Sequence, residues 1–278
     1  MAAYSSLVSR PAGWQRLRWA LADGMTVMRR DLAHGRYEPG ELIGALVFPA
    51  IMVVLFGYVF GSAIVVPGGG NYREYLIPGL FVMTSVTGVM TTLTGVAADI
   101  SRGVMDRFRS MPMARLAVPF GRAGADIVTG ALGLVIMAGM GLLVGWRAHH
   151  GAADTVAAFA LLILFRYAVT WVGVFLALLV KNEATADNLV PLVFPVTMIS
   201  NSFVPTSGMP AWLRAISDWN PVSAAVAACR SLFGNPGGPA AGAAWPLHHP
   251  VIATLGWSAL LLTTFVPLAA YRFRTMGR

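Results

Sequence analysis

Residues 155–180 read TVAAFALLILFRYAVTWVGVFLALLV, a stretch of 26 residues in which Arg166 carries the only formal charge. A helix needs about 20 predominantly apolar residues to cross a bilayer. Lys181, the only lysine of the chain, follows directly after Val180. The stretch therefore predicts a membrane-spanning helix that ends at a charged residue.

The rest of the 278-residue chain has the same apolar character. Hydrophobic residues make up 56% of it and charged residues 12%, whereas soluble domains carry about a quarter charged residues. The short runs of alternating polarity that are typical of an outer-membrane barrel do not occur. We expect an all-α polytopic membrane protein.

Two regions are predicted, a cytoplasmic N-terminal segment at 1–41 and a transmembrane domain at 42–278. In the first, apolar residues recur at steps of three and four on one helical face, with arginines between them. This pattern favours an amphipathic helix in the membrane interface, and a soluble helix packed on a partner is the alternative. The second contains six predicted spans: about 42–66, 75–98, 118–146, 155–180, 188–204 and 251–271.

The segment between the last two spans is broken by proline and glycine, yet it is apolar. We expect a re-entrant region at about 205–233, with one short helix around Trp212, Leu213 and Ile216 and another over 222–233. Such segments are tolerated at membrane depth where protein covers the backbone. A seventh span is the alternative.

The basic residues predict the orientation. With the N-terminus in the cytoplasm, fifteen basic residues lie in cytoplasmic segments, and only Arg73, Arg147, Arg214 and Arg230 lie opposite. Because positive charge is enriched on the cytoplasmic side, both termini are predicted to be cytoplasmic, with Asn71, His149 and Gly237 outside. Arginines that cluster beside spans indicate topology rather than binding of nucleic acid.

A nucleotide-binding P-loop needs a Gly-Lys pair, and Val180 precedes the only lysine. If this chain moves cargo with ATP, the ATPase is another polypeptide. A metal site is not expected, because all five histidines lie outside the spans and no carboxylate or cysteine cluster completes a ligand set.

The connection between the second and third spans is a candidate for contact with such a partner. Its apolar residues Ile100, Val104, Phe108 and Met111 fall on one face of a short helix. The other residues of interest in this stretch are Asp99, Arg102, Gly103, Asp106, Arg107 and Arg109. Spacing alone leaves two interpretations open, a helix that seats in a partner's groove and a positively charged loop that only fixes topology.

Arg166 lies about 16 Å into its span at the helical rise. A charge at that depth faces a partner or a wet cavity, and Asp126 near the start of the third span is the obvious partner. A structural ion pair and a contact with cargo are both open.

Several motifs read together resemble a known family. They are Phe194-Pro195, Ser200-Asn201-x-Phe203-Val204-Pro205, Met209-Pro210-x-Trp212-Leu213, Asn220-Pro221 and Arg230, preceded by Arg102-Gly103-x-x-Asp106-Arg107-x-Arg109. The order of these motifs resembles type-two ABC exporter permeases, most closely the daunorubicin-resistance permease group. That family more often has Glu at the position of Asp106.

The resemblance implies six spans, an interfacial elbow helix and short re-entrant helices before the last span. It also implies that two permease subunits, identical or homologous, pair in the bacterial cytoplasmic membrane. Each would dock one copy of a separate ATPase, which holds ATP and Mg, through the connection between spans 2 and 3.

The predicted function is export of hydrophobic or amphiphilic cargo, such as a drug, an antibiotic or a lipid. A permease for a polysaccharide or glycolipid is one alternative. An ion-coupled secondary carrier is another, although it would want carboxylates near the membrane midplane, where only Asp126 approaches.

Overall fold

The computed structural model describes residues 24–26, 28–29, 47, 51–60, 66, 69–104, 117–180 and 182–275. These residues are helical with connecting turns, and they contain no strand. The chain is therefore all-α in the part described, as predicted.

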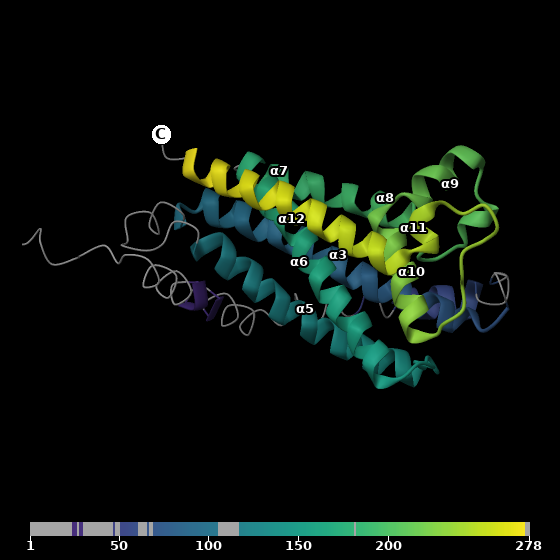
Figure 1. Cartoon of the computed structure of the whole chain (residues 1–278). Helices are drawn as coiled ribbons and strands as arrows, with labels where there is room; N and C mark the ends of the chain where they lie inside the picture. Colours follow the sequence, from purple (N-terminus) through teal and green to yellow (C-terminus); the bar gives the residue numbers. More distant parts are fainter. Residues whose placement is uncertain are drawn as a thin grey trace, which may run out of the picture.

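Four long helices run the length of the molecule: α3 (Tyr72–Ser101), α5 (Ala117–Leu143), α6 (Ala152–Val180) and α12 (Pro250–Thr275) (Figure 1). Each is long and apolar enough to cross a membrane. They correspond to the predicted spans at 75–98, 118–146, 155–180 and 251–271. Helix α6 packs against α3, α5 and α12, and so forms the centre of the bundle.

About half of the first predicted span, 42–66, lies outside the described residues. The part described within it includes a π-helix, η1 (Leu55–Phe60). The predicted N-terminal helix is likewise described only at residues 24–26 and 28–29, which are helical. The six-span count and the interfacial helix therefore stay predictions.

The fifth predicted span, 188–204, differs from expectation. The chain forms three short pieces, α7 (Glu183–Leu189), η2 (Val190–Leu192) and α8 (Val193–Met198), of which none alone is long enough to cross a bilayer. Proline removes a backbone donor and clashes with the preceding helical turn, and Pro191 and Pro195 fall within this run. The backbone stays in the αR region at the junctions, so the three pieces form one helical run over 183–198, which begins before the predicted span and ends before its bound at 204.

The segment that follows contains η3 (Thr206–Gly208), α9 (Ala211–Asp218), α10 (Pro221–Phe233) and α11 (Trp245–His248). Helix α10 has clear sequence signals: the Asn220 side chain accepts a hydrogen bond from Val222 N, Pro221 occupies the first turn, and Gly234 ends the helix with φ 69°. Short helices therefore occur where two were expected, whereas their entry into the membrane stays a prediction.

Loops that are far apart in sequence meet at one end of the bundle, where α9, α10 and α11 lie (Figure 1). His149 Nε2 is 3.0 Å from Glu74 Oε1, and His149 N donates to Phe233 O at 2.7 Å. An aromatic cluster lies beneath, with Phe81, Trp146 and Phe233 ring centroids 5.1–5.8 Å apart. The loops around Asn71, His149 and Gly237 thus share one end, and the C-terminal end of α12 lies at the other.

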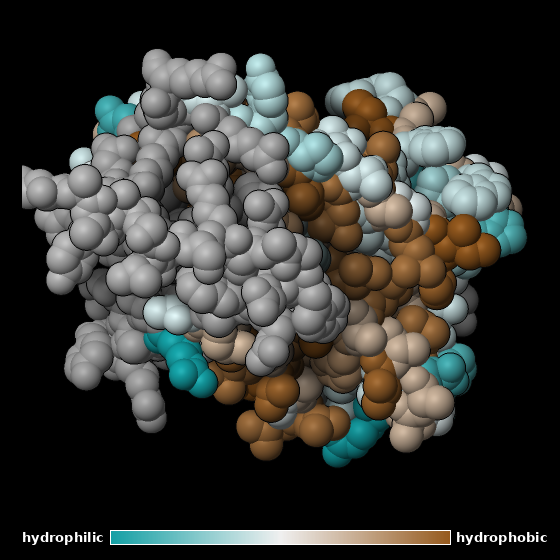
Figure 2. Space-filling model, turned by 60° about the vertical axis from the view of Figure 1, so that its left-hand side comes forward, coloured by the Kyte–Doolittle hydropathy of each residue, from teal (hydrophilic) through white to brown (hydrophobic). Residues whose placement is uncertain are grey.

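Hydrophobic residues gather across the middle of one face of the molecule, with hydrophilic residues mainly at its margins (Figure 2). Large apolar side chains also project outward from α5 and α12, among them Val135, Leu143 and Ile252, which are 67%, 88% and 62% exposed. Exposed apolar surface of this extent marks contact with lipid or with another protein.

Candidate functional site

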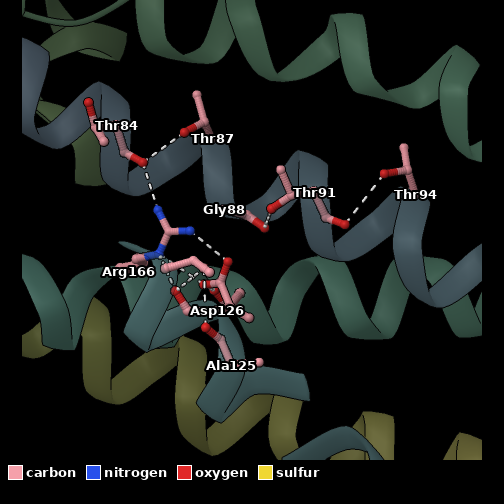
Figure 3. A network of polar contacts seen from close by, with 10 residues as sticks. Thr84, Thr87, Gly88, Thr91, Thr94, Ala125, Asp126 and Arg166 are labelled. Carbon is pink, nitrogen blue, oxygen red and sulfur yellow. Dashed lines mark hydrogen bonds and ion pairs between the residues drawn. The ribbon is translucent and has the colours of Figure 1, made fainter. Parts of the chain in front are cut away.

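Arg166 of α6 lies against Asp126 of α5 in the interior of the bundle (Figure 3). Its Nη2 donates to Asp126 Oδ1 at 2.6 Å, and its Nε donates to Asp126 Oδ2 at 3.0 Å. The two side chains are only 7% and 6% exposed. This two-point contact is the geometry in which a guanidinium binds a carboxylate most strongly.

Neighbouring groups complete the network. Thr170 Oγ1 donates to Asp126 Oδ2 at 2.7 Å, and Arg166 Nη1 donates to the Thr84 main-chain oxygen at 2.8 Å. Arg166 Nε also lies 3.1 Å from the Asp126 main-chain oxygen. The network therefore joins α3, α5 and α6.

Two glycines make room for the guanidinium. A Cβ on Gly88 of α3 would lie 2.9 Å from Arg166 Cζ and 3.0 Å from Asp126 Oδ2. A Cβ on Gly130 of α5 would overlap Arg166 Nε and Cδ. The guanidinium fits between the helices because both positions lack a side chain. Nothing in their sequence spacing distinguishes these two glycines from the other 28 of the 30 in the chain.

The burial of the Arg166–Asp126 pair indicates a structural role. Arg166 and Asp126 are buried together and meet through two hydrogen bonds, so the predicted ion pair is present in the structure. A buried pair adds little net stability over apolar packing, but removing one partner costs several kcal/mol. We infer that the pair fixes how α3, α5 and α6 sit against one another.

Four threonines follow one another along α3 at steps of three, four and three: Thr84, Thr87, Thr91 and Thr94 (Figure 3). Their hydroxyls donate to carbonyl oxygens of the same helix at 2.7–3.2 Å. Because each hydroxyl is satisfied within its own helix, the row is compatible with an apolar environment. The row was not among the predicted site residues, although its spacing is visible in the sequence.

A groove of about 240 Å³ lies between α3 and α8. It is lined almost wholly by apolar atoms, from Met83, Val86, Thr87, Met90, Val193, Phe194 and Thr197. Helix α3 therefore carries the charged network on the side of Thr84 and Gly88 and the groove on the side of Met83 and Thr87. The groove is not predictable from the sequence, because it depends on how the segment at 183–198 packs against α3.

The predicted connection between spans 2 and 3 is described only at its start. Helix α3 continues to Ser101, so Asp99 and Ile100 belong to the long helix and not to a separate short one. The helix thus extends beyond the predicted span bound of about 98, since no proline or glycine stops it before the Arg102–Gly103 turn. Asp106, Arg107, Phe108 and Arg109 lie outside the described residues.

Charged residues tie this end of the bundle together. Arg122 Nη1 is 3.4 Å from Asp99 Oδ2, and a Cβ on Gly95 would overlap the Arg122 guanidinium. Arg102 Nη2 is 3.9 Å from Glu183 Oε1 in an exposed pair. The end of α3 thus contacts the start of α5 and of α7 through opposite charges.

Several residues of the motifs that carry the family resemblance lie at the opposite end of the bundle, around Arg230 of α10. Arg230 is 2% exposed. Arg230 Nε donates to Tyr75 O at 2.9 Å, and Nη2 donates to the main-chain oxygens of Asn201 and Ser202 at 2.9 and 3.1 Å. The Tyr75 ring lies under the guanidinium at 3.4 Å. Its hydroxyl donates to Asn201 O at 2.9 Å, so Arg230 and Tyr75 hold the turn after α8 against α3.

The other residues of these motifs lie at helix ends or contact neighbouring helices. Asn220 Nδ2 donates to Val196 O and Ile199 O at 2.8 and 2.7 Å, which ties the start of α10 to α8. The Phe203 ring is buried, 4.7 Å from Phe56 of η1. Pro205 precedes η3, Pro210 precedes α9, Pro221 begins α10, and Trp212 is 68% exposed.

Within the described ranges, no group of three or more histidine, cysteine or acidic residues is arranged to hold a metal ion. Cys229 is buried and makes no disulfide there.

Comparison with known proteins gives a consistent result. The ABC-2 type transporter family matches residues 25–233. The chain is 30% identical over 256 residues to a daunorubicin resistance ABC transporter permease of Streptomyces coeruleorubidus, covering 92% of this chain and 87% of that protein. It is also similar to two proteins of Mycobacterium tuberculosis. One is a probable doxorubicin resistance ABC transporter permease, 24% identical over 93% of this chain and 91% of the relative. The other is a doxorubicin resistance ABC transporter permease, 27% identical over 88% and 87%.

Proposed function

Because this chain belongs to the ABC-2 type transporter family, we propose that it is the permease subunit of an exporter powered by a separate ATPase. Its cargo would be hydrophobic or amphiphilic molecules, moved from the cytoplasm or the inner leaflet across the bacterial cytoplasmic membrane. The observation that carries the proposal is that a chain of this family lacks the Gly-Lys pair of a P-loop anywhere in its sequence.

The cargo class rests on two observations. The relatives carry names that refer to daunorubicin and doxorubicin resistance. The groove between α3 and α8 offers an apolar surface beside a helix whose threonine hydroxyls are satisfied internally. Ligand sites of this kind are mostly apolar and contain few polar groups. We propose that the groove lines the cargo path.

The partner would dock on the connection between α3 and α5. At the described start of this connection, Arg102 forms an exposed pair with Glu183 of α7. The residues that follow Arg102 in the sequence include the apolar and charged side chains expected of a docking helix. Two copies of the ATPase and a second permease, identical or homologous, would complete the exporter. The exposed apolar side chains on α5 and α12 offer a surface that a second permease, as well as lipid, would contact.

The structure offers less support for an ion-coupled carrier. Asp126 is the acidic residue that such a mechanism would use, and both of its carboxylate oxygens accept hydrogen bonds from Arg166 or Thr170. Both oxygens are therefore already occupied by donors of the same chain, and neither is left free to bind a coupling ion.

The proposal is tested by narrowing the groove. Thr87→Trp places an indole in a space of about 240 Å³, while Val135→Trp, on the exposed side of α5, adds the same group outside it. ATP-dependent doxorubicin uptake is measured in inside-out vesicles that contain the permease and its co-purified ATPase. We expect Thr87→Trp to lose most of the uptake and Val135→Trp to keep it. Equal uptake by the two variants would remove the groove from the cargo path.

A further inference from the structure

Arg230 has a buried N–H group without a hydrogen-bond partner among the residues that the structure describes. Its Nε and Nη2 donate to three main-chain oxygens, whereas Nη1 is buried and makes no hydrogen bond within the described residues. Buried polar groups in native structures nearly always have partners, and for a charged group the cost of lacking one is high. An unused guanidinium N–H therefore points to a missing acceptor.

The charge of Arg230 is also unmatched. In the described part of the chain, no carboxylate lies within ion-pair distance of its guanidinium, in contrast to Arg122 and Arg166. Carbonyl oxygens and the Tyr75 ring surround it instead. These groups are dipoles, and they leave the site with a net positive charge.

A cavity of about 30 Å³ adjoins Arg230. Its polar lining includes Asn201, Thr206 and Ser207, and Arg230 is the only charged residue among those that line it. Asn201 Oδ1 is buried without a hydrogen bond. Rotating this amide by half a turn would present its N–H₂ group as a second donor. Ser207 and Gly238 are exposed at the rim, so the cavity can be entered from the surface.

We propose that this cavity is an anion-binding site, in which one oxygen of a phosphate or carboxylate group accepts a hydrogen bond from Arg230 Nη1. The volume suits one such oxygen, since a single water needs about 10–15 Å³ on the same measure. The rest of the group would lie toward Ser207 and Gly238 at the rim. This proposal does not depend on the cargo or on the ATPase.

The anion has two sources, a free phosphate in the aqueous phase and the headgroup of an anionic lipid. Both supply the same oxygen chemistry, and the rim is at the end of the bundle that we predict to lie outside. The bound anion would neutralise Arg230 and so stabilise the contact between α10, the turn at Asn201–Ser202 and α3.

Thermal unfolding of the full-length protein in a neutral detergent tests the site. Unfolding is followed after adding inorganic phosphate, sodium chloride at equal ionic strength, or short-chain phosphatidylglycerol with phosphatidylcholine as its control. We expect phosphate or phosphatidylglycerol to raise the apparent Tm by about 2–4 °C, and the two control additions to raise it less. A response to phosphate identifies the free anion, and a response to phosphatidylglycerol alone identifies the headgroup.

Arg230→Gln would break three main-chain contacts and could prevent folding, so the decisive variant is Asn201→Asp. It places a carboxylate in the cavity and supplies the missing counter-charge from within the chain. We expect its Tm without phosphate to equal or exceed that of the wild type, and its response to the anions to vanish. Asn182→Asp, which changes an exposed helix cap at the other end, should keep the wild-type response.

Two results would overturn the proposal. One is that neither phosphate nor phosphatidylglycerol raises the Tm of the wild type above its control. The other is that Asn201→Asp lowers the Tm and retains the anion response, which would mean that the cavity holds water and that the anions act elsewhere.

Discussion

Replacing Asp126 with alanine should destabilise the bundle strongly, because it strands a buried guanidinium. The substitution removes the acceptors for Arg166 Nη2, Arg166 Nε and Thr170 Oγ1, at 2.6, 3.0 and 2.7 Å. At about 1.5–3 kcal/mol for each hydrogen bond to a charged group, the gross loss is about 4–9 kcal/mol. Relaxation recovers part of it, and breaking buried pairs typically costs about 3–5 kcal/mol. Because the Thr84 and Asp126 main-chain oxygens remain as acceptors, we expect about 3 kcal/mol.

The assay is thermal unfolding in mild detergent, read from the fraction that stays monodisperse. A loss of about 3 kcal/mol corresponds to a fall in Tm of about 6–12 °C. Glu183→Gln is the matched control, since it breaks an exposed pair of 3.9 Å and should cost under about 1 kcal/mol. The double variant Asp126→Leu with Arg166→Met removes both charges and should recover most of the loss. The reasoning is refuted if Asp126→Ala costs no more than Glu183→Gln, or if the double variant loses the sum of its two single variants.

Gly130→Ala should lower the Tm by several degrees, because its Cβ would displace the Arg166 guanidinium, whereas Gly139→Ala should not, because a Cβ there meets nothing within 4 Å; similar Tm values would contradict this account. Asn220→Ala removes a helix cap and two hydrogen bonds to the segment around α8. Thermal unfolding should show a loss of about 1–2 kcal/mol in the free energy of unfolding. An unchanged Tm would show that the cap does not stabilise the protein. A cysteine at His149 in a Cys229→Ser background should react with an impermeant maleimide added to intact cells, and labelling only after lysis would reverse the predicted orientation.

The sequence predicted the parts of the fold that depend on composition and local signals. The four long helices follow from uninterrupted apolar stretches of bilayer length, and α10 follows from Asn220, Pro221 and Gly234. The partner of Arg166 was also within reach, because Asp126 is the acidic residue in a neighbouring span. A buried positive charge needs an acidic partner, and few acidic residues lie within or beside the predicted spans.

The rest depended on packing that one sequence does not show. The apolar residues of 183–198 are visible in the sequence, but the packing of this segment against α3, which creates the groove, is not. Helix α3 continues beyond the predicted span bound of about 98, and the pairing of Asp99 with Arg122 on this extension depends on packing against α5. Arg230 was identified from the family resemblance alone, and only the structure shows its contacts with Tyr75, Asn201 and Ser202.

The central claim is that this chain is a permease that takes its energy from another polypeptide through the connection between α3 and α5. It is tested most directly by comparing Phe108→Ala with Arg109→Ala in that connection, because a buried aromatic anchor contributes more to an interface than a rim charge does. The measurement is the amount of ATPase that co-purifies with the detergent-solubilised permease, together with ATP hydrolysis by the permease alone. The account predicts no hydrolysis by the permease alone, and a larger loss of ATPase for Phe108→Ala than for Arg109→Ala at equal membrane insertion. Hydrolysis by the pure permease, or wild-type recovery of the ATPase with Phe108→Ala, would contradict it.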